Sequence, residues 1–234
     1  MINNFENSDQ SGGRSVSEAN RGDCLQGINK YLEDYVDDML IKDIRELKEK
    51  NIEASYPYLV LSFMGIDFFG LLDMGISTAI VGKRCRWFIK EWMGRVNGAY
   101  KNKALGYLIY DCCRCGIVHN GVLKNYFYVS SYRYQGKHLN FSPGREFIYF
   151  DSKEFASNFI EAQRMFREDI QDRGDEYIKR VYDNLKGMIS CNQKSNRDNF
   201  EEVISSGSLK ICEYYISVVD TTTTKPPEEL GIIE

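Results

Sequence analysis

Histidine and proline are scarce in this sequence, whose 234 residues include two histidines and four prolines. With so few imidazoles, the range of possible histidine-based sites is short. No stretch resembles a P-loop, a Rossmann glycine fingerprint or the nucleophile motif of a serine hydrolase. The chemistries that depend on those motifs are therefore disfavoured.

The chain contains seven cysteines, an odd number, so they cannot all form disulfides within one chain. Three of them crowd together as Cys112, Cys113 and Cys115, and the others are scattered. This pattern indicates a reducing compartment, so we expect a cytoplasmic protein. The cluster has no second ligand pair at zinc-site spacing, so we expect buried cysteines there and no metal or other cofactor.

Long apolar runs without charge are also lacking. The nearest approach is residues 57–82, which contain Asp67, Asp73 and four glycines. A carboxylate at the centre of a bilayer costs about 2.5–3.5 kcal/mol. We therefore predict a buried helix in a water-soluble protein and no membrane partner. The start of the chain lacks the basic and apolar regions of a secretory signal, and residues 1–23 are predicted to be a disordered arm.

The charge is distributed unevenly. The whole chain has a net charge of −4, whereas residues 83–124 hold nine basic and two acidic residues. Affinity for a polyanion follows the local field, so this block favours an anionic partner. A solvated helix face balanced by acidic neighbours is the alternative. Trp87, Trp92 and the tyrosines are expected to serve the core or an interface and not to stack on bases.

Apolar residues spaced by three or four predict an all-α bundle. We expect one domain over residues 24–219, with a short β-hairpin near 137–150 around a Ser-Pro-Gly turn and a disordered tail over 220–234. The segment 209–219 is ambiguous between helix and strand. In the second helix, Gly65 and Gly70 predict the close approach of another backbone. Helices are predicted over residues 25–49, 57–72, 84–100, 104–119, 155–170, 178–189 and 198–205.

Two Arg/His pairs share a spacing of five residues: Arg114 with His119, and Arg133 with His138. A neutral imidazole can take the proton of an RNA 2′-hydroxyl, and a guanidinium can hold phosphate oxygens and stabilise the charge of the transition state. Such a pair suffices for RNA cleavage without a metal. The first pair lies in the basic block, whereas the second is expected in a polar loop, so the first is the better candidate.

The segment YDCCRCGIVHN at 110–120, with SFMGIDFFG at 62–70 and RWFIKEWM at 86–93, resembles the HEPN domains (higher eukaryotes and prokaryotes nucleotide-binding). The resemblance covers roughly residues 25–190. It implies a helical fold, a homodimer with paired sites at its cleft, and metal-independent ribonuclease activity, often in toxins or defence effectors. On this resemblance Arg114 and His119 take the catalytic positions.

Further residues are assigned around that pair. Asn120 and Lys124 are predicted to bind substrate, and Asp67 and Cys115 to support the site. Active members of the family often place a polar residue where this chain has Cys115. The alternative is a catalytically inactive helical dimer that binds RNA, a nucleotide or a partner protein, for example in a toxin and antitoxin system. In that case Arg114 pairs with an acid such as Asp67 and His119 caps a helix.

Overall fold

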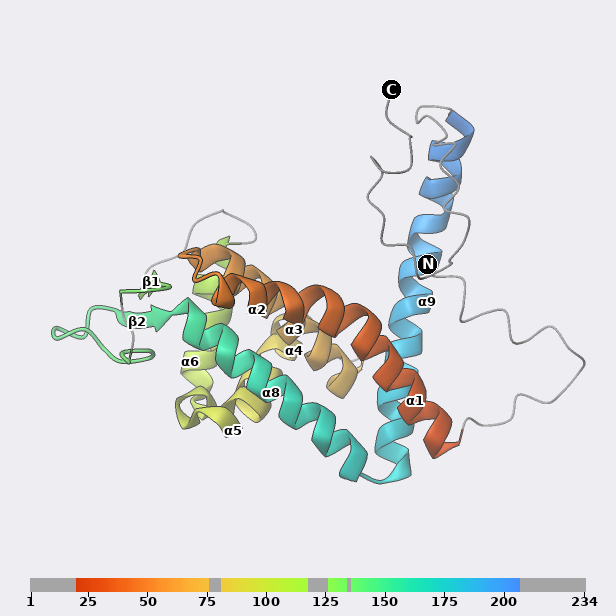
Figure 1. Ribbon diagram of the computed structural model, residues 1–234, viewed down its shortest axis with the longest axis horizontal. Helices are drawn as coiled ribbons and strands as arrows, with labels where there is room; N and C mark the ends of the chain where they lie inside the picture. Colours follow the sequence, from red (N-terminus) through yellow and green to blue (C-terminus); the bar gives the residue numbers. More distant parts are fainter. Residues whose placement is uncertain (1–19, 76–80, 118–125, 134–135, 207–234) are drawn as a thin grey trace, which may run out of the picture. The chain divides into compact units, whose positions relative to one another are not determined.

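A computed structural model describes residues 20–75, 81–117, 126–133 and 136–206. The described chain is mostly helical, with a short two-stranded parallel sheet (Figure 1). It divides into two compact units, of which the first ends at Met188. The second begins at Ile189, and its described part, residues 189–206, is helical. The predicted tail, the ambiguous segment 209–219 and residues 1–19 of the predicted arm lie outside the described residues.

The first helical stretch consists of α1 (Arg21–Tyr31), a π-helical segment η2 (Leu32–Ile41) and α2 (Lys42–Glu49). It begins inside the predicted arm, because the Asn20 side chain accepts a hydrogen bond from the backbone N–H of Asp23 at 3.0 Å and so caps α1. The predicted apolar face is confirmed. Its buried members include Ile28, Leu32, Val36 and Ile44.

Helix α3 (Ser55–Met74) packs against both α8 and α4 and forms the centre of the first unit. By length and hydropathy alone it could cross a membrane, but ten of its residues are buried among other elements, including Phe63, Ile66 and Phe69. A Cβ atom on Gly70 would lie 2.6 Å from the carbonyl oxygen of Arg84, which confirms the predicted backbone approach. At Gly65 the close neighbour is instead the Phe159 ring.

The predicted third and fourth helices are present but divided. The third comprises α4 (Val81–Phe88), the π-helical η3 (Ile89–Met93), α5 (Gly94–Val96) and a 3₁₀ turn, η4 (Gly98–Lys101). It breaks at Asn97, whose backbone is extended and whose side chain caps η4. The fourth comprises α6 (Lys103–Leu108) and the π-helical η5 (Ile109–Cys115), with Asn102 capping α6. The last predicted residues of this helix, 118 and 119, lie outside the described part.

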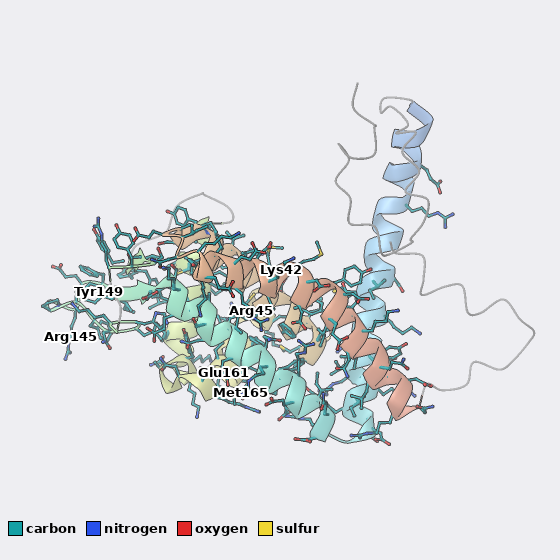
Figure 2. The ribbon with its side chains drawn as sticks, in the orientation of Figure 1. Lys42, Arg45, Arg145, Tyr149, Glu161 and Met165 are labelled. Atoms are coloured by element: carbon teal, nitrogen blue, oxygen red, sulfur yellow. The ribbon has the colours of Figure 1, made fainter. Side chains whose placement is uncertain are left out.

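The two arms of the predicted hairpin are antiparallel, since the Leu139 N–H donates to the Tyr149 carbonyl and the Ser142 N–H to the Phe147 carbonyl, both at 2.8 Å, but the two regular strands pair differently. Strands β1 (Phe127–Ser130) and β2 (Ile148–Asp151) run parallel, with Phe127 opposite Ile148. The Ser-Pro-Gly turn contributes a single antiparallel bridge, between Phe141 and Ile148. Alternating residues do not specify every partner of a strand, and β2 gains a second, parallel partner from further back in the chain. Figure 2 shows Tyr149 of β2 beside this turn.

Asp151 ends β2 and begins helix α8 (Ser152–Asp172), because its carboxylate accepts hydrogen bonds from the backbone N–H groups of Lys153 and Glu154. Helix α8 places a row of aromatic side chains against α3 and α4, with Trp92 edge-on to Phe166 at 4.9 Å between ring centroids. Helix α9 runs from Asp175 to Ser206. The predicted separate helices over 178–189 and 198–205 are therefore parts of one helix.

Candidate functional site

Arg114 is half-buried in η5, and its guanidinium carbon lies 5.7 Å from the centroid of the Tyr110 ring. It is close enough to Cys85 to favour the thiolate form of that side chain. Burial outweighs this effect and, with the nearby Asp67 carboxylate, raises the pKa of Cys85 to about 12. Cys85 is therefore an inert core thiol, and Arg114 is one of several charged groups near it.

His119, Asn120 and Lys124 lie outside the described residues. The convergence of Arg114 and His119, and the substrate-binding roles of Asn120 and Lys124, therefore stay predictions.

Asp67 has a structural partner in a different arginine. The Arg84 guanidinium donates two hydrogen bonds to the Asp67 carboxylate, from Nε at 3.0 Å and from Nη2 at 3.2 Å. Both side chains are largely buried, and this bidentate pair joins α3 to α4 directly beside the Gly70 contact. Asp67 therefore stabilises the packing of α3 against α4.

Cys115 is half-buried and forms a hydrogen bond with the Tyr110 side chain. The pKa of Tyr110 is raised, first by burial and then by this contact. Tyr110 therefore stays a neutral phenol between Cys115 and Arg114. Cys112 and Cys113 are buried, as predicted.

His138, predicted in a polar loop, is 7% exposed. The backbone N–H of Asp151 donates to Nδ1 at 3.0 Å, and Nε2 lies 2.7 Å from the Tyr100 hydroxyl. Because a backbone N–H can only donate, the neutral ring carries its proton on Nε2 and donates it to Tyr100. Burial lowers the pKa of His138 to about 4. This histidine is a neutral structural link between η4 and β2 and not half of an exposed pair with Arg133.

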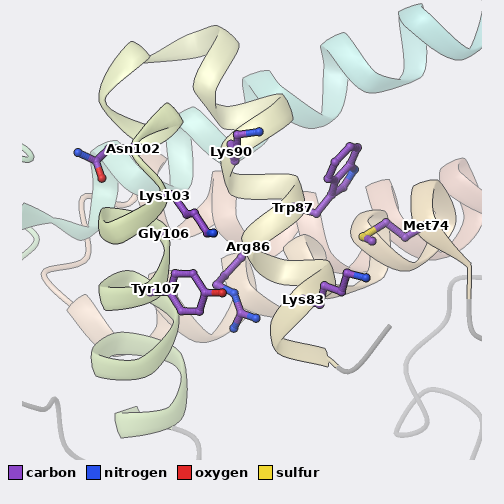
Figure 3. Close-up of a pocket in the computed structure, with 9 residues that line it drawn as sticks. All are labelled: Met74, Lys83, Arg86, Trp87, Lys90, Asn102, Lys103, Gly106 and Tyr107. Atoms are coloured by element: carbon purple, nitrogen blue, oxygen red, sulfur yellow. The ribbon is translucent and has the colours of Figure 1, made fainter. Parts of the chain in front are cut away.

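A groove of about 320 Å³ opens between α4–η3 and the start of α6 (Figure 3). Four cationic and two large aromatic side chains line it: Lys83, Arg86, Lys90, Lys103, Trp87 and Tyr107. Lys90 pairs with Glu91 at 2.7 Å. Within residues 20–75, 81–117, 126–133 and 136–206, the other three cations have no carboxylate partner. We call this the cationic groove.

Aromatic side chains connect the cationic groove to Arg114. The guanidinium carbon of Arg86 lies 4.2 Å from the Tyr107 ring centroid and 5.4 Å from that of Tyr110. Tyr110 in turn lies against Arg114. Guanidinium groups within about 6 Å of a ring face are attracted by its quadrupole. A row of alternating cations and rings therefore runs from the groove along α6 and η5 to Arg114.

Trp87 is fixed at the rim of the groove. Its indole N–H donates to Asp73 Oδ2 at 2.9 Å, and the same carboxylate accepts hydrogen bonds from Trp92 at 3.0 Å and Tyr177 at 2.8 Å. Trp92 is buried, as predicted, but 39% of Trp87 is exposed. Of the two expected locations, core or interface, Trp92 therefore lies in the core, whereas Trp87 is held in place with much of its surface in water and its place in an interface stays a prediction.

All four cations of the groove fall within the basic block, residues 83–124, that the sequence predicts as a site for an anionic partner. The groove itself could not be predicted from the sequence. Trp87 and Tyr107 lie twenty positions apart in the sequence, so no local spacing connects them. Asp73, an acidic residue near the end of the apolar helix α3, is the residue that could have indicated the position of Trp87, because its carboxylate accepts the indole N–H.

Comparison with known proteins identifies no related protein. No family model, no curated protein and no solved structure matches this chain. In the described part of the chain there is no cluster of three or more His, Cys, Asp or Glu side chains that could hold a metal ion.

Proposed function

We propose that this protein binds RNA along the cationic groove and cleaves it without a metal through Arg114 and His119. The observation that supports the proposal best is the continuous row of cations and aromatic rings from the groove to Arg114. Unpaired lysines and arginines attract phosphates, and aromatic faces accept bases. The row thus joins a surface suited to a nucleic-acid strand to the arginine of the better Arg/His pair.

The reaction follows from the two side chains. The His119 imidazole takes the proton of a 2′-hydroxyl, whose oxygen forms a bond to the adjacent phosphorus while the bond to the 5′-oxygen breaks. The Arg114 guanidinium stabilises the extra negative charge on the phosphate oxygens. The leaving 5′-oxygen takes a proton from the imidazolium or from water. The products end in a 2′,3′-cyclic phosphate and a 5′-hydroxyl.

Cleavage of a mixed panel of unstructured RNAs in EDTA, with mapping of the product ends, tests this proposal. We expect cyclic phosphate ends in EDTA and loss of cleavage in His119→Ala and Arg114→Ala at unchanged melting temperature. Arg133→Ala provides a matched control, because this exposed arginine belongs to the second pair. Cleavage that requires added Mg²⁺, or that survives His119→Ala, would reject the mechanism.

The second candidate is a catalytically silent RNA-binding dimer. It is favoured by Cys115, which occupies a position where active HEPN domains often carry a polar residue. Here Cys115 is half-buried and forms a hydrogen bond with the Tyr110 side chain. This candidate predicts that the wild-type protein binds the same RNAs but cuts none of them.

A further inference from the structure

The two aromatic side chains of the cationic groove come from different helices. Trp87 lies on α4 and Tyr107 on α6, and Figure 3 shows them on opposite sides of the groove. Trp87 is 39% exposed and Tyr107 is 49% exposed, so both rings offer a face to a ligand. The hydrogen bond to Asp73 fixes Trp87, and the guanidinium of Arg86 covers one side of Tyr107. Both aromatic side chains are therefore held in place before a ligand binds, so binding costs little of their conformational entropy.

The residue before Tyr107 in α6 is a glycine that also lines the groove. A Cβ atom built on Gly106 would meet nothing within 4 Å. Glycine costs roughly 1 kcal/mol relative to alanine inside a helix, and here no neighbouring atom requires it.

Lys83, Lys90 and Lys103 also line the groove, and Figure 3 shows the Lys103 side chain next to Tyr107. A volume of about 320 Å³ is at the lower end of the range of small-ligand sites. The groove therefore combines two flat apolar walls with a cationic border. That combination suits a nucleotide, whose flat base can contact an aromatic ring while the phosphates before and after it contact the lysines.

We propose that the cationic groove receives one unpaired nucleotide of an RNA strand, with its base against Trp87 and Tyr107 and its flanking phosphates on the lysines. This inference rests on the proposed function. A base within an A-form duplex keeps its faces stacked on its neighbours and cannot enter, so the groove selects single-stranded RNA over duplex. It is a positioning site for substrate, separate from the reacting groups.

Fluorescence anisotropy with a labelled unstructured RNA and with the same strand annealed to its complement tests the proposal. The Arg114→Ala variant serves as the background, so that the result does not depend on cleavage. We expect the single strand to bind at least about fivefold more tightly than the duplex, as loss of one base–aromatic contact implies. Equal affinity for the two RNAs would overturn the proposal.

Gly106→Leu adds a side chain to the wall of the groove, and Gly98→Leu, at an exposed glycine outside the groove, is the control, since a Cβ atom at either position meets nothing within 4 Å. We expect Gly106→Leu to weaken single-strand binding at least about fivefold at unchanged melting temperature, and Gly98→Leu to bind like the parent. Unchanged binding by Gly106→Leu would overturn the proposal. If the single-strand preference is found but the wild type cuts no RNA, the proposed catalysis fails and the nucleotide site stands.

Discussion

The Arg86 guanidinium carbon lies 4.2 Å from the centroid of the Tyr107 ring, so a cation of α4 is stacked on an aromatic side chain of α6. Both residues line the cationic groove. Because Arg86 has no carboxylate partner among the residues that the structure describes, its charge remains available to an anion. This contact places a fixed positive charge beside a base-sized space.

Lys103 offers a direct test of phosphate binding. Each phosphate contact to a single strand contributes about 0.7 to the slope of log affinity against log salt concentration. We expect Lys103→Ala to weaken RNA binding and to lower that slope by about 0.7. Lys42→Ala is the control, since this exposed lysine lies on α2, which contributes no residue to the lining of the groove. Equal slopes for the two variants would show that Lys103 touches no phosphate.

The contact between α3 and α4 predicts a loss of stability in Gly70→Ala. The added Cβ would lie 2.6 Å from the Arg84 carbonyl oxygen, so α4 must move away from α3 and strain the pair of Arg84 with Asp67. We expect urea denaturation to show a loss of about 1–3 kcal/mol, which exceeds the gain in helix propensity. Gly174→Ala, in open space between α8 and α9, should stay within about 0.5 kcal/mol of wild type.

His138 makes stability depend on pH. Its pKa is about 4 in the folded protein, below the ordinary value of 6.5, because the ring is buried. Between these values the unfolded chain binds the extra proton, so stability is full above about pH 6.5 and falls as the pH approaches 4. The expected loss from this group is about 3 kcal/mol.

Urea unfolding of wild type and His138→Asn between pH 7 and pH 4 measures this effect. The asparagine oxygen can still accept the Asp151 N–H but does not titrate. The stability advantage of wild type over His138→Asn should therefore shrink as the pH falls. An advantage that is constant across this range would show that His138 is not buried in its neutral form.

Assembly is tested at Tyr110 and Ile117, in and just after η5. Ile117 and Tyr110 are half-buried in the single chain, whereas Tyr107 belongs to the groove. We predict a homodimer that covers Ile117, with a mass about twice 27.1 kDa by light scattering at micromolar concentration. Ile117→Asp should give the mass of one chain without unfolding. A wild-type protein that shows only 27.1 kDa would contradict the dimer.

The helices and their buried faces could be predicted because apolar spacing directly reports which face is covered. Ile28, Leu32 and Ile44 are buried as their spacing predicts. The antiparallel contact around the Ser-Pro-Gly turn could be predicted, but the parallel pairing could not, because alternation in Ile148–Asp151 does not specify a partner distant in the chain. The exposure of Trp87 depends on one carboxylate, Asp73, that reaches it from another helix. Such contacts between distant positions leave no periodic signal.

The central claim, that RNA lies in the cationic groove and extends toward Arg114, is tested most directly by cross-linking. An unstructured RNA containing 4-thiouridine is irradiated with the Arg114→Ala protein, and the cross-linked peptides are identified by mass spectrometry. The account predicts cross-links within residues 81–110, at Trp87 and Tyr107 above all, and their loss in Gly106→Leu. Cross-links confined to β1, β2 or α9, with none between 81 and 110, would contradict it.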